Sequence, residues 1–235
     1  MSRVETETVT VGELTAHLAR PADAESVGAM LVLPMITGID AQVREYASDI
    51  AAAGMTALVW DPWHGPTSDD TPRERLFELM GQLDDETCLG EMGALLGHLR
   101  DALGFERVGV IGYCLGGRFA LLLGARDPLL SNVIAYHPSI WDPAPANHSL
   151  DAIAEASAIT APVLILHAGA DTILTTGSLG RLRAALENRD APTAVQVYPG
   201  AEHGFSSRAR HDNPVNATAY ALSWPQALAF ASASL

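Results

Sequence analysis

Positively charged residues are scarce in this sequence. Its 235 residues include 14 Lys and Arg against 28 Asp and Glu, and the formal net charge is -14 at pH 7. Nucleic acids and anionic membrane surfaces are themselves negatively charged, so this balance argues against both as partners. A negatively charged small substrate would have to be met by local positive charge.

Cysteines and long apolar runs are also scarce. Cys88 and Cys114 are the only two cysteines, and their spacing is not that of a metal site. We therefore predict no metal and a reduced, cytoplasmic protein, with Cys88 on the core face of a helix. No apolar run is long enough to span a bilayer, and residues 1–7 lack the apolar centre of a signal peptide.

Apolar runs of strand length alternate with segments of helical spacing. Strands are predicted at residues 4–11, 14–18, 28–33, 55–60, 108–113, 132–136, 163–167 and 194–198. Helices are predicted near residues 40–51, 73–80, 85–103, 115–125, 178–188 and 218–232. This alternation predicts an α/β fold, with a mostly parallel central sheet and helices on both faces. Because no repeat or linker interrupts the chain, we predict a single domain over residues 1–235.

A glycine-flanked cysteine follows the predicted strand at 108–113. Gly112, Cys114 and Gly116 form the pattern Gly-x-Cys-x-Gly, which is the cysteine version of a nucleophile elbow. The glycines allow a sharp turn without a Cβ clash. The following helix would place its first amides near the sulfur and favour the thiolate over the thiol. Cys114 is therefore predicted to be a nucleophile.

Two further polar loops follow predicted strands. Asp171 comes after the strand that ends at His167, and His203 comes after the strand that ends at Tyr198. The chain order of nucleophile, acid and histidine is that of the α/β-hydrolases. His203 would take the thiol proton, and Asp171 would orient its imidazole. The backbone amides of Leu115 and Ile36 would form the oxyanion hole.

Each of these residues also has an ordinary structural interpretation. A cysteine is often a small core residue, an aspartate after a strand often only stabilises a turn, and a histidine in a loop is often solvated. The flanking glycines favour a functional Cys114. Chain order favours Asp171, and favours His203 over His64, His137, His167 and His211.

These motifs resemble the dienelactone hydrolase family of α/β-hydrolases over nearly the whole chain. The most specific parts are the segments 112–117, 169–171 and 198–205. The resemblance implies a Cys-Asp-His triad that hydrolyses an enol-lactone or related ester, through a thioester and without a metal or organic cofactor. It implies a small ester or lactone as partner, bound by a monomer or small homo-oligomer.

The sequence departs from this family at one position. Family members that act on dienelactone carry a glutamate in the loop after the third strand, where it takes part in activating the thiol. Met35 stands at the matching position, and a thioether accepts no proton at neutral pH. We therefore expect Cys114 to be activated by His203 and the helix end alone.

The resemblance also suggests residues that bind the substrate. The family holds a substrate carboxylate with arginines, and Arg73 and Arg208 lie near the matching positions. A guanidinium forms a fork that fits a carboxylate. The alternative for each is a solvated surface arginine, which is as plausible as substrate binding for Arg208 but less so for Arg73. Phe77 matches an aromatic position near Arg73. Tyr136 and Phe205 are predicted to line an apolar pocket, with burial in the core as the alternative.

Two other functions share the elbow pattern. Class I glutaminases also place a cysteine there, but they need a His-x-Glu pair that the residues 203–205 lack. The other is a hydrolase fold with weak or no turnover. Such a protein would bind a ligand or sense oxidants through Cys114, since an accessible thiolate at a helix start is prone to oxidation.

Overall fold

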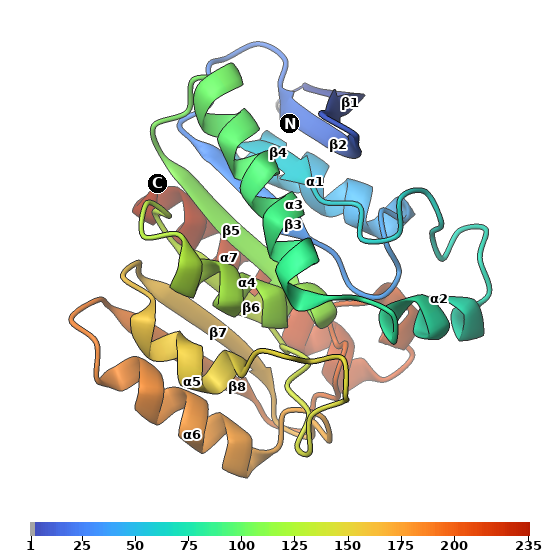
Figure 1. The fold of residues 1–235 in the computed structure, drawn as a ribbon, viewed down its shortest axis with the longest axis vertical. Coiled ribbons are helices and arrows are strands. Elements are labelled where there is room, and N and C mark those ends of the chain that lie inside the picture. Colours follow the sequence, from blue (N-terminus) through green and yellow to red (C-terminus); the bar gives the residue numbers. More distant parts are fainter. Residues whose placement is uncertain (1–2) are drawn as a thin grey trace.

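The computed structural model describes residues 3–235 and has an eight-stranded sheet at its centre (Figure 1). The strands are β1 (Val4–Val11), β2 (Leu14–Pro21), β3 (Ala29–Leu33), β4 (Thr56–Val59), β5 (Val108–Tyr113), β6 (Val133–Tyr136), β7 (Val163–Ala168) and β8 (Thr193–Tyr198). Their order across the sheet is β1-β2-β4-β3-β5-β6-β7-β8. β1 and β2 pair antiparallel, as do β2 and β4, while all other neighbours are parallel. The predicted mostly parallel sheet is confirmed.

Helices cover both faces of the sheet, as predicted. α1 (Ala41–Ala52) and α7 (Pro214–Ser234) pack on one face. α3 (Asp85–Gly97), α4 (Leu115–Arg126), α5 (Ala152–Glu155) and α6 (Thr176–Glu187) pack on the other. α2 (Arg73–Met80) stands to one side of these layers (Figure 1). No helix within residues 3–235 is both long and apolar enough to cross a membrane.

The central strands are apolar on both faces because both faces are covered. All five residues of β3 are buried. Leu31 and Leu33 join the core beneath α3 and α4, whereas Met30 and Val32 join the core beneath α1 and α7. This division follows from the alternation of side chains along a strand. The same alternation decides which side chains near the site face away from it.

Two predicted helices have different bounds in the structure. The helix expected at 85–103 ends as α3 at Gly97 and continues as a π-helical turn over His98–Ala102. The C-terminal helix begins four residues earlier than expected, because Asn213 caps it and Pro214 occupies its first turn. Cys88 is 3% exposed on α3, and burial raises its pKa to about 12. This thiol is therefore unreactive.

A buried ion pair joins α3 to α4. The Arg118 guanidinium and the Asp85 carboxylate are each 2% exposed and form two hydrogen bonds of 2.6 and 2.7 Å. Asp85 also accepts from the backbone N–H of Leu150, and Arg118 donates to the Leu150 carbonyl. The pair therefore fixes the segment before α5 to both helices.

Candidate active site

Cys114 occupies a strained turn between β5 and α4. Its φ of 52° and ψ of -111° lie in a region that L-residues rarely adopt. The turn brings backbone into close contact on both sides. A Cβ on Gly112 would lie 2.0 Å from the Gly116 carbonyl oxygen, and one on Gly116 would lie 2.1 Å from the Leu33 carbonyl oxygen. Glycine is therefore required at both flanking positions of the elbow.

Cys114, His203 and Asp171 form a hydrogen-bonded chain. His203 Nε2 lies 3.2 Å from Cys114 Sγ, and His203 Nδ1 lies 2.8 Å from Asp171 Oδ2. The Asp171 side chain is fully buried, and its other oxygen accepts from the backbone N–H groups of Ile173 and Leu174. A carboxylate only accepts hydrogen bonds, so Nδ1 carries a proton and Nε2 faces the sulfur.

The contacts around Cys114 favour a thiolate–imidazolium pair. Burial by itself would raise the pKa of the Cys114 thiol. The charge of His203 and hydrogen bonds from His203, Ser139 and the Leu115 N–H outweigh it and hold that pKa below its ordinary value. Burial lowers the pKa of His203, but the Cys114 thiolate and Asp171 raise it to about 10. The two shifts agree in direction, since each favours the thiolate–imidazolium pair over the neutral pair.

Leu115 and Ile36 are the residues whose backbone amides are predicted to form an oxyanion hole. Leu115 is the first residue of α4, and its N–H points to the Cys114 sulfur. The Ile36 N–H donates to no acceptor among residues 3–235. The Gly116 N–H donates to the Pro34 carbonyl at 3.0 Å, and the Trp63 indole donates to the Ile36 carbonyl at 2.9 Å. These bonds hold the Ile36 loop against the elbow.

Two adjoining cavities share the walls formed by Ile36, Arg73, Cys114, His203 and Arg210. The first, of about 280 Å³, adds a mainly apolar lining from Phe77, Met80, Trp141 and Ile173. The second, of about 570 Å³, adds Met35, Leu76 and the polar side chains of Thr37, Gln42, Ser68, Thr71 and Ser207. The sulfur of Cys114 thus lies where the two chambers meet. Each chamber has room for one part of a molecule cleaved at Cys114.

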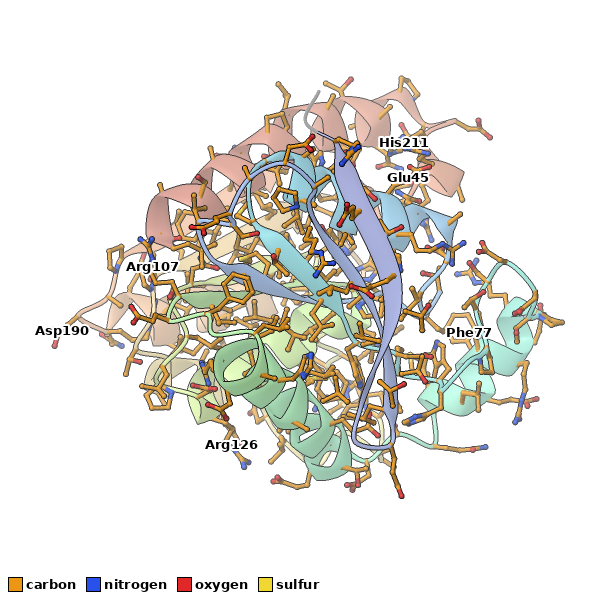
Figure 2. The ribbon with its side chains drawn as sticks, turned by 90° about the horizontal axis from the view of Figure 1, so that it is seen from above. Glu45, Phe77, Arg107, Arg126, Asp190 and His211 are labelled. Carbon is orange, nitrogen blue, oxygen red and sulfur yellow. The ribbon has the colours of Figure 1, made fainter. Side chains whose placement is uncertain are left out.

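Arg73 and Phe77, both predicted to bind substrate, lie in the cavity wall. Both come from α2, where the Arg73 guanidinium lies 5.3 Å from the centre of the Phe77 ring. Figure 2 shows Phe77 between α2 and the body of the molecule. Arg73 has no ion-pair partner within residues 3–235. Its positive charge is therefore available to a ligand.

Arg208 does not line either cavity, and its prediction as a substrate-binding residue was wrong. Its side chain is directed at the surface, where it forms an ion pair with Glu45 of α1. Arg210 lines both cavities instead. The two arginines belong to one tight 3-10 turn, in which residues two apart point in different directions. Figure 2 labels Glu45 and His211 at the corner where this turn meets α1.

Tyr136 and Phe205 are core residues, so their prediction as pocket residues was also wrong. Both are 0% exposed, and their ring centres lie 5.9 Å apart. Tyr136 is the last residue of β6, and its side chain points to the face covered by α1 and α7. A pocket at the strand ends does not reach this face. Strand alternation puts Tyr136 there, but a single sequence does not show which face bears the site.

Ser139 is a site residue that the sequence patterns missed. Its Oγ lies 3.0 Å from Cys114 Sγ and 3.2 Å from His203 Nε2, and it faces the smaller cavity. It follows β6, which neighbours β5 in the sheet. The sheet order, once known, would have pointed to this loop. Among residues 3–235, no three His, Cys, Asp or Glu side chains gather in a possible metal site.

Comparisons with known proteins agree with this geometry. The model of the family described as "Dienelactone hydrolase family" matches residues 14–234. The chain is 29% identical over 204 residues to a Bradyrhizobium protein named "Probable 2-oxo-3-(5-oxofuran-2-ylidene)propanoate lactonase", covering 83% of this chain and 80% of that one. It is 27% identical over 218 residues to the carboxymethylenebutenolidase of Rhodococcus opacus, covering 91% and 84%.

A solved structure supports the fold. The Klebsiella pneumoniae protein described as a "Putative Dienelactone Hydrolase" superposes with a TM-score of 0.85 at 21% identity, over 98% of this chain and 99% of that one. Brefeldin A esterase, another neighbour, superposes with a TM-score of 0.66 at 20% identity. The predicted α/β-hydrolase fold is thereby confirmed.

Proposed function

This chain belongs to the dienelactone hydrolase family, and we propose that it is a cysteine hydrolase of small esters or lactones, with Cys114, His203 and Asp171 as its catalytic triad. The observation that carries the proposal is the hydrogen-bonded chain from the sulfur through both imidazole nitrogens to a buried carboxylate. The Leu115 amide beside the sulfur and the cavities that meet at it add support. The related lactonase and carboxymethylenebutenolidase point to the same class of reaction.

In the first half of the reaction, the Cys114 thiolate attacks the acyl carbon. The carbonyl electron pair moves onto the oxygen, which the Ile36 and Leu115 N–H groups stabilise as an oxyanion. When the intermediate collapses, the carbon–oxygen bond to the leaving group breaks. The leaving alkoxide takes the proton from His203 Nε2. A thioester and a neutral His203 remain, and a lactone substrate stays attached at its acyl end.

In the second half, His203 acts as a base. Its Nε2 accepts a proton from water as the oxygen attacks the thioester carbon. The same amides hold the second oxyanion, and its collapse breaks the carbon–sulfur bond. This step regenerates the thiolate and the imidazolium and releases the acid. Asp171 keeps the imidazole in the orientation that both halves need.

Arg73 and Arg210 suit a substrate that carries a carboxylate. Both guanidinium groups border the junction where the two cavities meet. The nearest carboxylate to Arg210 is Glu202, at 3.9 Å, which is long for a hydrogen bond. Against a net charge of -14, these two side chains supply the local positive charge that an acidic substrate requires. We propose that they bind the substrate carboxylate.

This assignment predicts the behaviour of matched substrates. An ester or enol-lactone with a free carboxylate should be hydrolysed with a higher kcat/KM than its neutral methyl ester. Arg210→Gln should reduce that preference by about 10-fold or more, because it removes a charged hydrogen bond. Steady-state kinetics on the pair of substrates measures both.

Arg208→Gln is the matched control, since Arg208 lies in the same turn but pairs with Glu45 outside the cavity. It should leave the preference unchanged. Equal losses in the two variants, or no loss in Arg210→Gln, would exclude Arg210 as the carboxylate-binding residue.

A partly exposed thiolate also supports a second candidate, an oxidant-sensing or ligand-binding protein with little turnover. The pH dependence of Cys114 separates the two. Because the pKa of the thiol is lowered, alkylation by iodoacetamide should remain fast below the ordinary thiol pKa of about 8.5. The rate of hydrolysis should rise with pH over the same acidic range as the rate of alkylation. It should decline as pH rises through about 10, where His203 loses its proton.

Mass spectrometry should find one adduct, on Cys114, because the pKa of the buried Cys88 is raised to about 12. A lowered thiol pKa with hydrolysis supports catalysis. A lowered thiol pKa without hydrolysis of any member of an ester and lactone panel supports sensing. A thiol that titrates at its ordinary value contradicts the ion pair.

The setting of the reaction is proposed from the two unpaired cysteines. Neither Cys88 nor Cys114 forms a disulfide, which suits a reducing compartment. We propose a cytoplasmic enzyme that works as a monomer or small homo-oligomer.

A further inference from the structure

Ser139 contacts both groups that exchange the catalytic proton. Its hydroxyl oxygen lies 3.0 Å from Cys114 Sγ and 3.2 Å from His203 Nε2, and the sulfur and that nitrogen are 3.2 Å apart. The three atoms form a nearly equilateral triangle. Ser139 is 5% exposed, so little water competes for its hydroxyl. A hydroxyl in this position must affect the charge state of the pair.

The backbone around Ser139 fixes this hydroxyl relative to the elbow. The Ser139 N–H donates to the Cys114 carbonyl at 2.9 Å, and the Cys114 N–H donates to the Tyr136 carbonyl at 3.0 Å. Between them, His137 has a φ of 33°, and its ring donates to or accepts from Ser206 at 2.8 Å. The strained backbone is thus held at both ends, which keeps the hydroxyl at the sulfur.

The loop that carries Ser139 also packs directly against the elbow. A Cβ on Gly117 would lie 2.8 Å from the Tyr136 carbonyl oxygen and 3.0 Å from Pro138 Cα. The start of α4 therefore touches the loop that carries Ser139. Ser139 is part of the elbow in space, although 25 residues separate it from Cys114 in the chain.

The hydrogen-bonding capacity of the triangle depends on its charge state. With a neutral thiol and a neutral imidazole, the S–H can donate to the Ser139 oxygen and the Ser139 O–H to His203 Nε2, so both bonds join neutral groups. With a thiolate and an imidazolium, the O–H of Ser139 and the N–H of His203 can both donate to the sulfur. A charged acceptor also strengthens both bonds. The hydroxyl therefore favours the charged pair over the neutral one.

We propose that Ser139 is a fourth catalytic residue, which donates a hydrogen bond to the resting Cys114 thiolate and so keeps the nucleophile charged before substrate binds. The role rests on the proposed function, because it assumes Cys114 is the nucleophile. Such a role fits this chain, because Met35 lines the adjoining cavity and its thioether cannot accept the thiol proton at neutral pH. The hydroxyl and the amide of Leu115 then supplement the charge of His203.

The test is the pH dependence of Cys114 alkylation in Ser139→Ala, which needs no substrate. Loss of one hydrogen bond to a charged sulfur should raise the measured pKa of the thiol by about one pH unit or more. Alkylation on the acidic limb should then be about 10-fold slower than in the wild type. On the alkaline side the two rates should converge or cross, because a less stabilised thiolate is the better nucleophile. Thiolate absorbance in the ultraviolet gives the same titration independently.

Two further variants make the result specific. Ser139→Thr keeps the hydroxyl and should restore the wild-type titration. Ser223→Ala removes another buried hydroxyl, on α7, which donates to the Tyr220 carbonyl and takes no part in holding the Ser139 loop, and it should leave the titration unchanged. Thermal unfolding shows that each variant is folded.

An unchanged thiol titration in Ser139→Ala would overturn the proposal, whether or not hydrolysis falls. An equal shift in Ser223→Ala would also overturn it, because the effect would then follow from the loss of any buried hydroxyl. If the titration shifts as expected but no ester or lactone is hydrolysed by the wild type, the proposed function fails while the contact between Ser139 and the thiolate stands.

Discussion

Cys114→Ala is expected to reduce kcat/KM for an activated ester by about 10⁴-fold or more. The substitution removes the only atom at the site that can form the thioester. The Ile36 and Leu115 amides and the cavity remain, so some residual rate over the uncatalysed reaction should persist. The loss should be in kcat more than in KM, because the sulfur bonds to the substrate only after binding.

Cys88→Ala is the natural control, because it replaces the other thiol, which is buried on α3 and borders neither cavity at the site. It should leave the kinetics unchanged. Burst kinetics and mass spectrometry of the trapped acyl enzyme would show a thioester on Cys114 in the wild type and in Cys88→Ala. If Cys114→Ala retained more than about one hundredth of the wild-type activity, a thioester mechanism would be untenable.

The largest expected loss of stability comes from Arg118→Met, at about 3–5 kcal/mol of unfolding free energy. This variant leaves the Asp85 carboxylate, which is 2% exposed, without its partner. A buried carboxylate without a counter-charge costs several kcal/mol in desolvation. For a chain of this size, the midpoint of thermal unfolding should fall by roughly 6–20 °C.

Denaturant unfolding at several pH values measures the effect. Burial would raise the pKa of Asp85, but the hydrogen bonds and charge of Arg118 outweigh it and hold the pKa below its usual value. A lowered carboxyl pKa contributes stability that is complete above its unfolded value of about 4 and is lost as pH falls through the folded value. The difference between wild type and Arg118→Met should therefore shrink in acid.

Two variants control for side-chain loss. Arg126→Met removes an arginine from the same helix, where it pairs with Glu86 at the surface and is 44% exposed, so it should cost less than about 1 kcal/mol. The double variant Asp85→Asn/Arg118→Met removes the orphan charge while keeping an acceptor for the Leu150 N–H. It should be more stable than Arg118→Met alone. A double variant less stable than the single one would show that the charge is not the cause.

Local sequence patterns predicted the strands and the turn that position the site residues. Continuous apolar runs indicated the buried parallel strands, since only a sheet covered on both faces buries every residue of a strand such as β3. The glycines around Cys114 indicated the elbow, since a Cβ at either one would overlap backbone. Asp171 and His203 each follow a strand, so parallel pairing of β5, β6, β7 and β8 brings them to one edge.

The same patterns did not predict the directions in which side chains point. Tyr136 ends the strand next to the elbow, but its ring enters the core beneath α7, because the strand register points it to that face. Arg208 and Arg210 lie in one short turn, and only its orientation against α1 selects Arg210 for the cavity. Position along the chain placed these residues near the site without showing which way they face.

The elbow at Cys114 is determined by the sequence itself, because a strand, a tight glycine turn and a helix are local structures that a few consecutive residues specify. The contacts that set the charge of its sulfur are decided by the tertiary structure. Ser139 and His203 both contact the sulfur, although they lie 25 and 89 residues from Cys114 in the sequence. A triangle of three polar atoms depends on the pairing of β5 with β6 and on the backbone of the loop that follows, and no local pattern encodes either.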